Sequence, residues 1–180
     1  MLDEIPKDYS AWTDAEKYLW HRAQSYLICE RNGWGDPQNY ARGKEIDASL
    51  ILGHMVSKEY SGSDASDEHN DEVEYKSTTG KNCQGAYTGI SNKQTWEGME
   101  EYLINEKILK YKWHFYNRYR KGRMVESWKM SGEDVHRILL PKLKKSWETR
   151  FTRADSRTGA NMSWKEIKKH GTKVYEKEEV

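Results

Sequence analysis

Residues 61–77 read SGSDASDEHNDEVEYKS, and the end of this segment predicts a short β-strand. Val73-Glu74-Tyr75-Lys76-Ser77 alternates apolar and charged side chains with a period of two. That period places Glu74 and Lys76 on one face of the strand and Val73 and Tyr75 on the other. Asp64 lies ten residues before Glu74, on a turn rich in Gly, Ser and Asn, from which it can fold back beside them.

Two carboxylates beside one lysine can hold a hard divalent cation and activate water for attack on a phosphate. Asp64 and Glu74 are therefore predicted ligands of Mg²⁺, together with the main-chain carbonyl of Tyr75. The ion would neutralise charge on the scissile phosphate and lower the pKa of a bound water molecule. Lys76 would orient or deprotonate that water, or stabilise the transition state. The prediction is a phosphodiesterase site with Asp64, Glu74 and Lys76 as its catalytic residues.

The pattern of Asp followed by Glu-x-Lys has low specificity, because a highly charged chain offers chance matches. Solvated surface charges on an α/β domain are the alternative for the whole pattern. Four nearby acidic residues could replace Asp64 as a ligand, although we interpret them as a solvated acidic loop. These residues are Asp67, Glu68, Asp71 and Glu72.

The net charge of +1 conceals two halves of opposite sign. Residues 1–76 contain 16 acidic and 8 basic side chains, whereas residues 77–180 contain 13 acidic and 22 basic ones. The stretch 107–170 alone holds 18 Lys and Arg against 6 Asp and Glu. A basic half beside an acidic metal-binding segment suits a polyanionic substrate such as nucleic acid, although a charge run is also typical of a solvated face.

With 180 residues, 33% charged and 36% apolar, the chain is predicted to form one soluble domain. Its eight Trp and twelve Tyr, against two Phe, fit core and interface packing, with base stacking as the alternative. Cys29 and Cys83 have no zinc-like spacing and no disulfide framework around them. No signal peptide or membrane-spanning apolar run is visible, so we expect an intracellular, cytoplasmic protein.

The N-terminal segment is predicted to be a helix over residues 13–30, with Thr13 as its cap and a turn over residues 32–37 after it. Trp12, Trp20 and Trp34 flank or decorate this helix. They indicate a helical dimerisation arm over residues 1–35, with ordinary core packing as the alternative.

The rest of the chain alternates predicted helices, strands and loops. Strands are expected over residues 72–77, 109–119, 124–130 and 173–175, the middle two forming a hairpin around Lys121-Gly122. Helices are expected over residues 93–106, from Ser131 onward, and over 164–169, and a helix is favoured over a strand for residues 45–55. Pro141 is expected to kink or interrupt its helix. Residues 78–92 and 152–163 are expected to be loops.

These elements predict an α/β fold in which a central mixed β-sheet, flanked by helices, carries the acidic segment. One domain, residues 1–180, would comprise the arm (1–35) and a catalytic and DNA-recognition core (36–180).

Six segments of the chain resemble, in the same order, segments of the PvuII-type restriction endonucleases, which are members of the PD-(D/E)xK nuclease superfamily. They are Gly43-Lys44, Gly62 to Asp67, Glu74-Tyr75-Lys76-Ser77, the loop Gly85 to Ser91, the hairpin Trp113 to Gly122, and His170-Gly171-Thr172-Lys173-Val174-Tyr175. The resemblance covers most of the chain, and identity between these segments is low.

The resemblance implies a restriction-endonuclease-like core in which Asp64, Glu74 and Lys76 match the catalytic Asp, Glu and Lys. It implies a Mg²⁺-dependent type II enzyme of a prokaryote or phage, with a cognate DNA methyltransferase as a genetic partner. The N-terminal helix matches the region that pairs subunits into a homodimer. Such a dimer would cut both strands of a short, palindromic or nearly palindromic double-stranded DNA site.

The segments that match the family's base-reading loops, 85–92 and 157–161, depart from its pattern. Thr88-Gly89-Ile90-Ser91 replaces a run of histidines, Thr158-Gly159 lacks the adjacent asparagines, and the acidic minor-groove residue is replaced near Asn39-Tyr40. We therefore expect related cleavage chemistry on a different DNA target. Five loop residues are candidate DNA contacts, namely Tyr87, Ser91, Asn92, Arg157 and Asn161.

Two other functions remain open on the sequence alone. A structure-selective or homing nuclease with the same core would cleave branched or long-site DNA. A non-enzymatic DNA-binding domain would carry the acidic strand without using it. The sequence does not specify the recognition site, the cut position or the number of metal ions.

Overall fold

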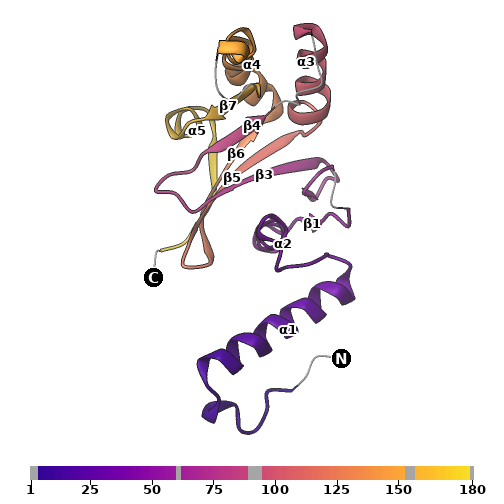
Figure 1. The fold of residues 1–180 in the computed structure, drawn as a ribbon, viewed down its shortest axis with the longest axis vertical. Coiled ribbons are helices and arrows are strands. Elements are labelled where there is room, and N and C mark those ends of the chain that lie inside the picture. Colours follow the sequence, from indigo (N-terminus) through magenta and orange to yellow (C-terminus); the bar gives the residue numbers. More distant parts are fainter. Residues whose placement is uncertain (1–3, 60–61, 89–94, 153–156, 179–180) are drawn as a thin grey trace.

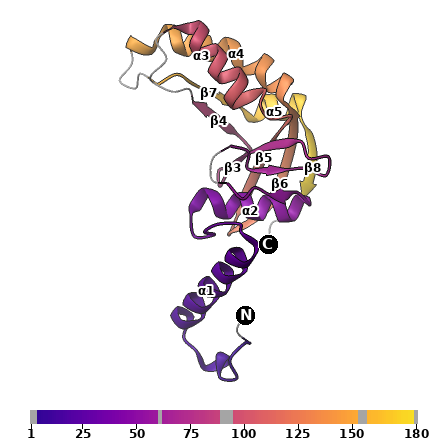
Figure 2. The same ribbon diagram turned by 90° about the vertical axis from the view of Figure 1, so that its right-hand side faces the viewer.

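The computed structural model describes residues 4–59, 62–88, 95–152 and 157–178. A long N-terminal helix, α1 (Asp14–Asn32), stands apart from an α/β body that contains all the strands (Figures 1 and 2). α1 starts at Thr13, where a capping box joins Thr13 and Glu16, and it ends at Gly33 in the left-handed conformation. The predicted N-terminal helix and its cap are therefore confirmed.

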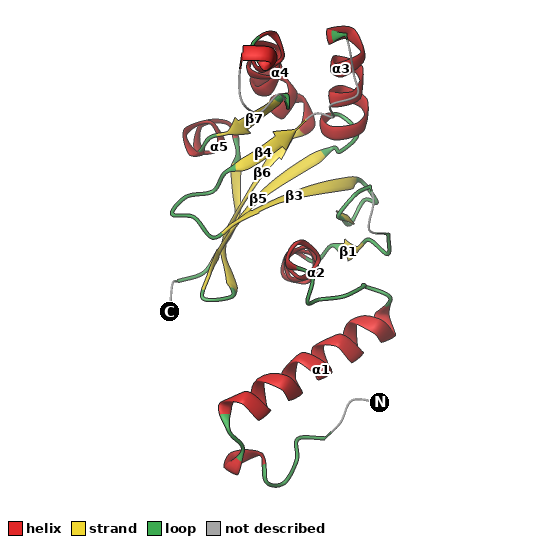
Figure 3. Cartoon of the chain, in the orientation of Figure 1, coloured by secondary structure: helices red, strands yellow, loops and turns green. Residues whose placement is uncertain are grey.

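The body is built on a six-stranded mixed sheet, which is yellow in Figure 3. In spatial order its strands are β1 (Met55–Val56), β2 (Ala65–Ser66), β3 (Glu72–Thr78), β5 (Trp113–Arg120), β6 (Arg123–Ser131) and β8 (Thr172–Glu176). Only β3 and β5 pair in parallel within this sheet; its other neighbours are antiparallel. The predicted α/β class with a central mixed sheet is confirmed at this level.

The β5–β6 hairpin forms where the sequence predicted it. Lys121 and Gly122 both have positive φ, at 46° and 75°. A two-residue turn of this kind matches the right-handed twist of the strands that it joins. Gly122 adopts this conformation without a steric penalty.

Two segments predicted to be loops contain strands instead, so those predictions are wrong in part. β4 (Gly85–Thr88) and β7 (Gly159–Met162) pair antiparallel as a separate two-stranded ribbon, with Ala86 opposite Asn161. Each strand has four residues. They form because they pair with one another and bury Tyr87 and Met162, a contact between distant segments that a local pattern does not reveal.

Five further helical segments surround the sheet and the ribbon. They are α2 (Tyr40–Leu52), α3 (Trp96–Tyr102) with the π-helical turn η2 (Leu103–Ile108), α4 (Gly132–Glu148) and α5 (Trp164–His170). Single 3₁₀ turns occur at η1 (Tyr9–Ala11) and η3 (Arg150–Thr152). The preference for a helix after Gly43-Lys44 is confirmed by α2.

Of the two predicted effects of Pro141, a kink or an interruption, the interruption does not occur. α4 continues for seven residues beyond Pro141, to Glu148. Val135, Leu139, Leu143 and Trp147 recur every four residues along one side of α4, and all are buried. This continuous apolar stripe stabilises the helix against the hydrogen bond lost at Pro141.

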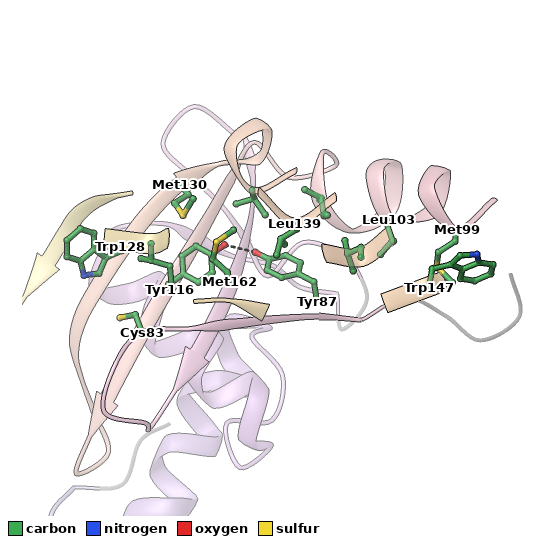
Figure 4. Packing of buried hydrophobic residues seen from close by; sticks show 14 residues of the cluster. Cys83, Tyr87, Met99, Leu103, Tyr116, Trp128, Met130, Leu139, Trp147 and Met162 are labelled. Carbon is green, nitrogen blue, oxygen red and sulfur yellow. Dashed lines mark hydrogen bonds between the residues drawn. The ribbon is translucent and has the colours of Figure 1, made fainter. Parts of the chain in front are cut away.

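The sheet separates two hydrophobic clusters. The larger one gathers side chains of α3, α4, α5 and the ribbon against one face of β5 and β6 (Figure 4). The smaller one packs Ala48 of α2 against Val73, Tyr75 and Phe115 on the other face. β3 thus contributes its odd-numbered side chains to the smaller cluster and turns Glu74 and Lys76 towards the ribbon. None of the helices in the described part of the chain is both long and apolar enough to cross a membrane.

Candidate active site

The structure brings Glu74 and Lys76 together on one face of β3, as the alternating pattern predicted. The Lys76 ammonium donates a hydrogen bond to Glu74 Oε1, and the two side chains are 23% and 15% exposed. In the parallel pairing with β5, Glu74 lies opposite His114 and Lys76 opposite Tyr116. The ion pair is therefore flanked, on the same face of the sheet, by two buried side chains of β5, and it remains partly accessible to solvent.

Asp64 joins this pair at the edge of β3 that faces away from β5, just before β2 begins. Its main-chain N–H donates to the Val73 carbonyl at 3.1 Å, and its carboxylate Oδ2 accepts from the Tyr75 N–H at 2.6 Å. β2 follows at once and pairs antiparallel with β3, with Ala65 opposite Val73. This reversal of the chain brings Asp64 close to Glu74, although the two residues are ten positions apart in the sequence.

The pKa of Asp64 is raised because its carboxyl group is buried near a second carboxylate. Burial and the nearby charge of Glu74 raise the pKa of Asp64 from 3.8 to about 8, with a further contribution from Glu45. The Tyr75 N–H and the Lys76 ammonium oppose this shift. Two buried like charges favour a proton or a cation between them. The site thus favours a bound positive charge at neutral pH.

The Tyr75 carbonyl faces the same side as Asp64. In a β-strand the N–H and C=O of one residue point towards the same neighbour. Since Asp64 receives the Tyr75 N–H, the Tyr75 carbonyl is directed to the same edge of the sheet. On the other face, the Tyr75 hydroxyl contacts His54 Nδ1 at 2.6 Å, which fixes the residue between Glu74 and Lys76.

These donors fit a hard cation. Two carboxylates and a carbonyl provide oxygen ligands only, and Mg²⁺ prefers one or two carboxylates plus water molecules. The described residues contain no cluster of three or more His, Cys, Asp or Glu placed to hold a metal ion. A cation here would complete its coordination with the carbonyl, water and substrate.

Two residues near the site were missed by the sequence-based prediction. The Tyr111 hydroxyl donates to the Gly62 carbonyl at 2.9 Å and so anchors the turn before Asp64. Burial, then Glu74 and Asp64, raise the pKa of Tyr111. Glu45 lies on α2, where Arg42 Nη1 pairs with it at 3.2 Å. Nothing in the local sequence indicates the contact between Tyr111 and Gly62, which are 49 residues apart.

The acidic residues after Asp64 mainly organise their own loop. Asp67 accepts hydrogen bonds from the N–H groups of His69 at 2.9 Å and Asp71 at 3.0 Å. Burial acts to raise the pKa of Asp67, but these bonds and nearby cations outweigh it and lower the pKa. Asp71 forms an ion pair with Lys112, and the Glu68 side chain is 81% exposed. The exposed Glu68 fits the predicted solvated acidic loop, whereas Asp67 is 5% exposed and is held by hydrogen bonds within that loop.

The candidate DNA contacts have different environments. Tyr87 is only 4% exposed, and its hydroxyl contacts His114 Nδ1 and the Tyr116 hydroxyl, both at 2.9 Å. This places Tyr87 in the core beneath the site, where a base edge does not reach it. Arg157 is exposed, and Asn161 is exposed on β7. Ser91 and Asn92 lie outside the described residues.

Comparison with known proteins does not identify a family. No protein-family model matches the chain, and no curated protein matches it. The assignment of the site therefore rests on its residues and their geometry.

Replacing Asp64 with Asn tests its raised pKa through stability. The folded state holds the Asp64 proton more tightly than the unfolded chain, so this carboxyl stabilises the fold below about pH 4. That contribution is lost as the pH rises towards 8. In EDTA, D64N is therefore expected to lose less stability between pH 5 and pH 8 than the unchanged protein, by on the order of a few kcal/mol.

Urea unfolding at both pH values measures this difference. E68Q, which changes an exposed carboxylate of the same segment, is the control and should follow the unchanged protein. Identical pH dependence for D64N and E68Q would contradict the electrostatic description of the site.

Proposed function

We propose that this chain is a Mg²⁺-dependent type II endonuclease that hydrolyses both strands of a short, specific double-stranded DNA site as a homodimer. The observation that carries the proposal is the meeting of Asp64, Glu74 and Lys76 at one edge of β3. The six ordered segments that resemble PvuII-type enzymes support the same function. The raised pKa of Asp64 supports a cation-dependent activity.

In this proposal each residue has a distinct task. Asp64, Glu74 and the Tyr75 carbonyl would hold Mg²⁺, and the ion would supply Lewis-acid activation of water and charge neutralisation at the phosphate. Lys76 projects from the same face of β3 as Glu74 and forms an ion pair with it. It orients the attacking water and stabilises charge that develops on the phosphate oxygens. Tyr111 keeps the Asp64 turn in place through Gly62.

A groove that contains two lysines lies beside the turn before Asp64, and it supports a polyanionic substrate. The groove has a volume of about 530 Å³ and is lined by Leu109 to Trp113 and by Ser131 to Glu133. Lys110 and Lys112 belong to this lining, and Tyr111 between them reaches the turn that carries Asp64. Cations on the path to the site would bind the DNA backbone and hold a phosphate near the carboxylates.

The exposed surface of α1 supports the homodimer. Tyr18 and Leu19 are 61% and 63% exposed, and Gln24 and Cys29 are the only buried residues of the helix. α1 projects away from the body in both views (Figures 1 and 2). A projecting helix with large apolar side chains needs a partner surface, and a second copy would provide it symmetrically.

Digestion of plasmid and phage DNA in MgCl₂ tests the function. Discrete fragments whose sequenced ends share one short motif are expected. Cleavage only of branched DNA, or only at a rare long site, would favour a structure-selective or homing nuclease. Binding of DNA without cleavage would favour a non-enzymatic DNA-binding domain and overturn the proposal.

E74Q and K76A are expected to abolish cleavage while DNA binding remains. Loss of a metal ligand, or of the lysine that assists the water, should lower the cleavage rate by about 100-fold or more. Cleavage assays and gel-shift measurements on the same plasmid fragments separate the two effects. E68Q should cleave normally, and normal cleavage by E74Q or K76A would refute the site assignment.

L19E is expected to convert the dimer into a monomer, because it places a charge in the proposed apolar interface. Sedimentation velocity measures the change, and circular dichroism checks that α1 stays helical. R31E, which changes the charge at the end of the same helix, is the control. A monomeric unchanged protein, or an L19E dimer, would exclude this role of α1.

A further inference from the structure

The strand β4 passes directly against Lys76, although it belongs to the ribbon rather than to the central sheet. We propose that β4 positions the Lys76 side chain for the reaction, with Gly85 and Tyr87 as positioning residues. This inference rests on the proposed nuclease function, because it assigns a role to the surroundings of that same lysine. The close approach of Gly85, the contact of the Tyr87 ring and the hydrogen bonds of the Tyr87 hydroxyl carry it.

Gly85 allows the closest approach between β4 and Lys76. A Cβ atom at Gly85 would lie 2.9 Å from Lys76 Cγ, 3.0 Å from Lys76 Cβ and 2.6 Å from Tyr116 Cε1. Cβ and Cγ form the inner part of the lysine side chain, which has little freedom to move aside. Any other residue at position 85 would therefore displace Lys76, its neighbour Tyr116 or the strand itself.

Tyr87 contacts the other end of the same lysine. The Lys76 Nζ atom lies 5.0 Å from the centroid of the Tyr87 ring, within the range of a cation–π interaction. Residues 85 and 87 point to the same side of β4, and both are buried. Gly85 thus accommodates the stem of Lys76, and Tyr87 provides a surface for its ammonium group.

The Tyr87 ring is itself fixed by a buried chain of hydrogen bonds. His114 Nε2 lies 3.0 Å from the Ile108 carbonyl, which only accepts, so Nε2 is the donor. His114 Nδ1 is then the acceptor of the Tyr87 hydroxyl, and Tyr116 donates to Tyr87. Figure 4 shows Tyr87 and Tyr116 facing one another across this bond.

This support is needed because Glu74 has two partners in the proposed mechanism. Without a cation, Glu74 accepts the Lys76 ammonium. A cation bound to Glu74 would share its negative charge and weaken its hold on the lysine. The contacts from Gly85 and Tyr87 do not depend on that charge, so they keep Lys76 in place when Glu74 binds the metal.

Three variants and one control test the inference. Y87L removes the ring, Y87F keeps the ring and removes its hydroxyl, and G85A adds the obstructing methyl group. W147L replaces a buried aromatic side chain of the same hydrophobic cluster, on α4 and outside the site. Supercoiled plasmid, MgCl₂ and a series of enzyme concentrations in excess over DNA give the saturating cleavage rate and the half-saturating enzyme concentration.

Y87L and G85A are expected to lower the saturating rate about tenfold or more, because a displaced catalytic group loses its alignment. Their half-saturating concentration should stay within about threefold, because neither side chain is expected to contact DNA. Y87F should cut faster than Y87L but more slowly than the unchanged protein, because it keeps the ring and loses the hydrogen bonds that fix it. W147L should lose melting temperature and keep its rate, which separates positioning from general stability.

A folded Y87L or G85A with the unchanged rate would overturn the inference, and so would a Y87F as slow as Y87L. If Y87L does not fold, the smaller change G85A decides the question by the same criterion. Failure of the proposed function gives a different result. In that case the unchanged protein does not cleave, or K76A cleaves normally, whatever the β4 variants do.

Discussion

The parallel pairing of β3 with β5 is the constraint on which the site depends. It places Glu74 beside His114 and Lys76 beside Tyr116, while the other edge of β3 pairs with β2, which directly follows Asp64. A shift by one residue would turn both charged side chains into the smaller hydrophobic cluster. Val73 and Tyr75 belong to that cluster, and the free energy lost on removing them from it stabilises the observed register.

Much of the fold and the centre of the site follow from local sequence patterns. The Thr13 cap, the Lys121-Gly122 turn and the alternation around Glu74 each act over a few residues, and each has the expected structure. The turn after residue 61 was enough to predict that Asp64 returns to the strand. These features depend on residues close in sequence. In the strand, for example, the direction of each side chain follows from its position along the strand.

The features that the sequence did not predict depend on distant partners. β4 and β7 are each too short to show a period. They form because residues 85–88 pair with residues 159–162, a distant segment of the chain. Tyr87 was a candidate for DNA contact because it lies in the segment that matches a base-reading loop of the resembled family, yet His114 and Tyr116 hold it in the core. Pro141 lies in an intact helix because four buried side chains of α4 outweigh one lost hydrogen bond.

Burial alternates along β4, so two of its positions tolerate amino-acid substitution less than the other two. Gly85 and Tyr87 face inward, whereas Ala86 and Thr88 are exposed, and Ala86 lies opposite Asn161 of β7. Substitutions at the outward positions leave the inward contacts with the lysine intact. A lineage could therefore vary the outer surface of the ribbon while the contacts between β4 and Lys76 are inherited unchanged.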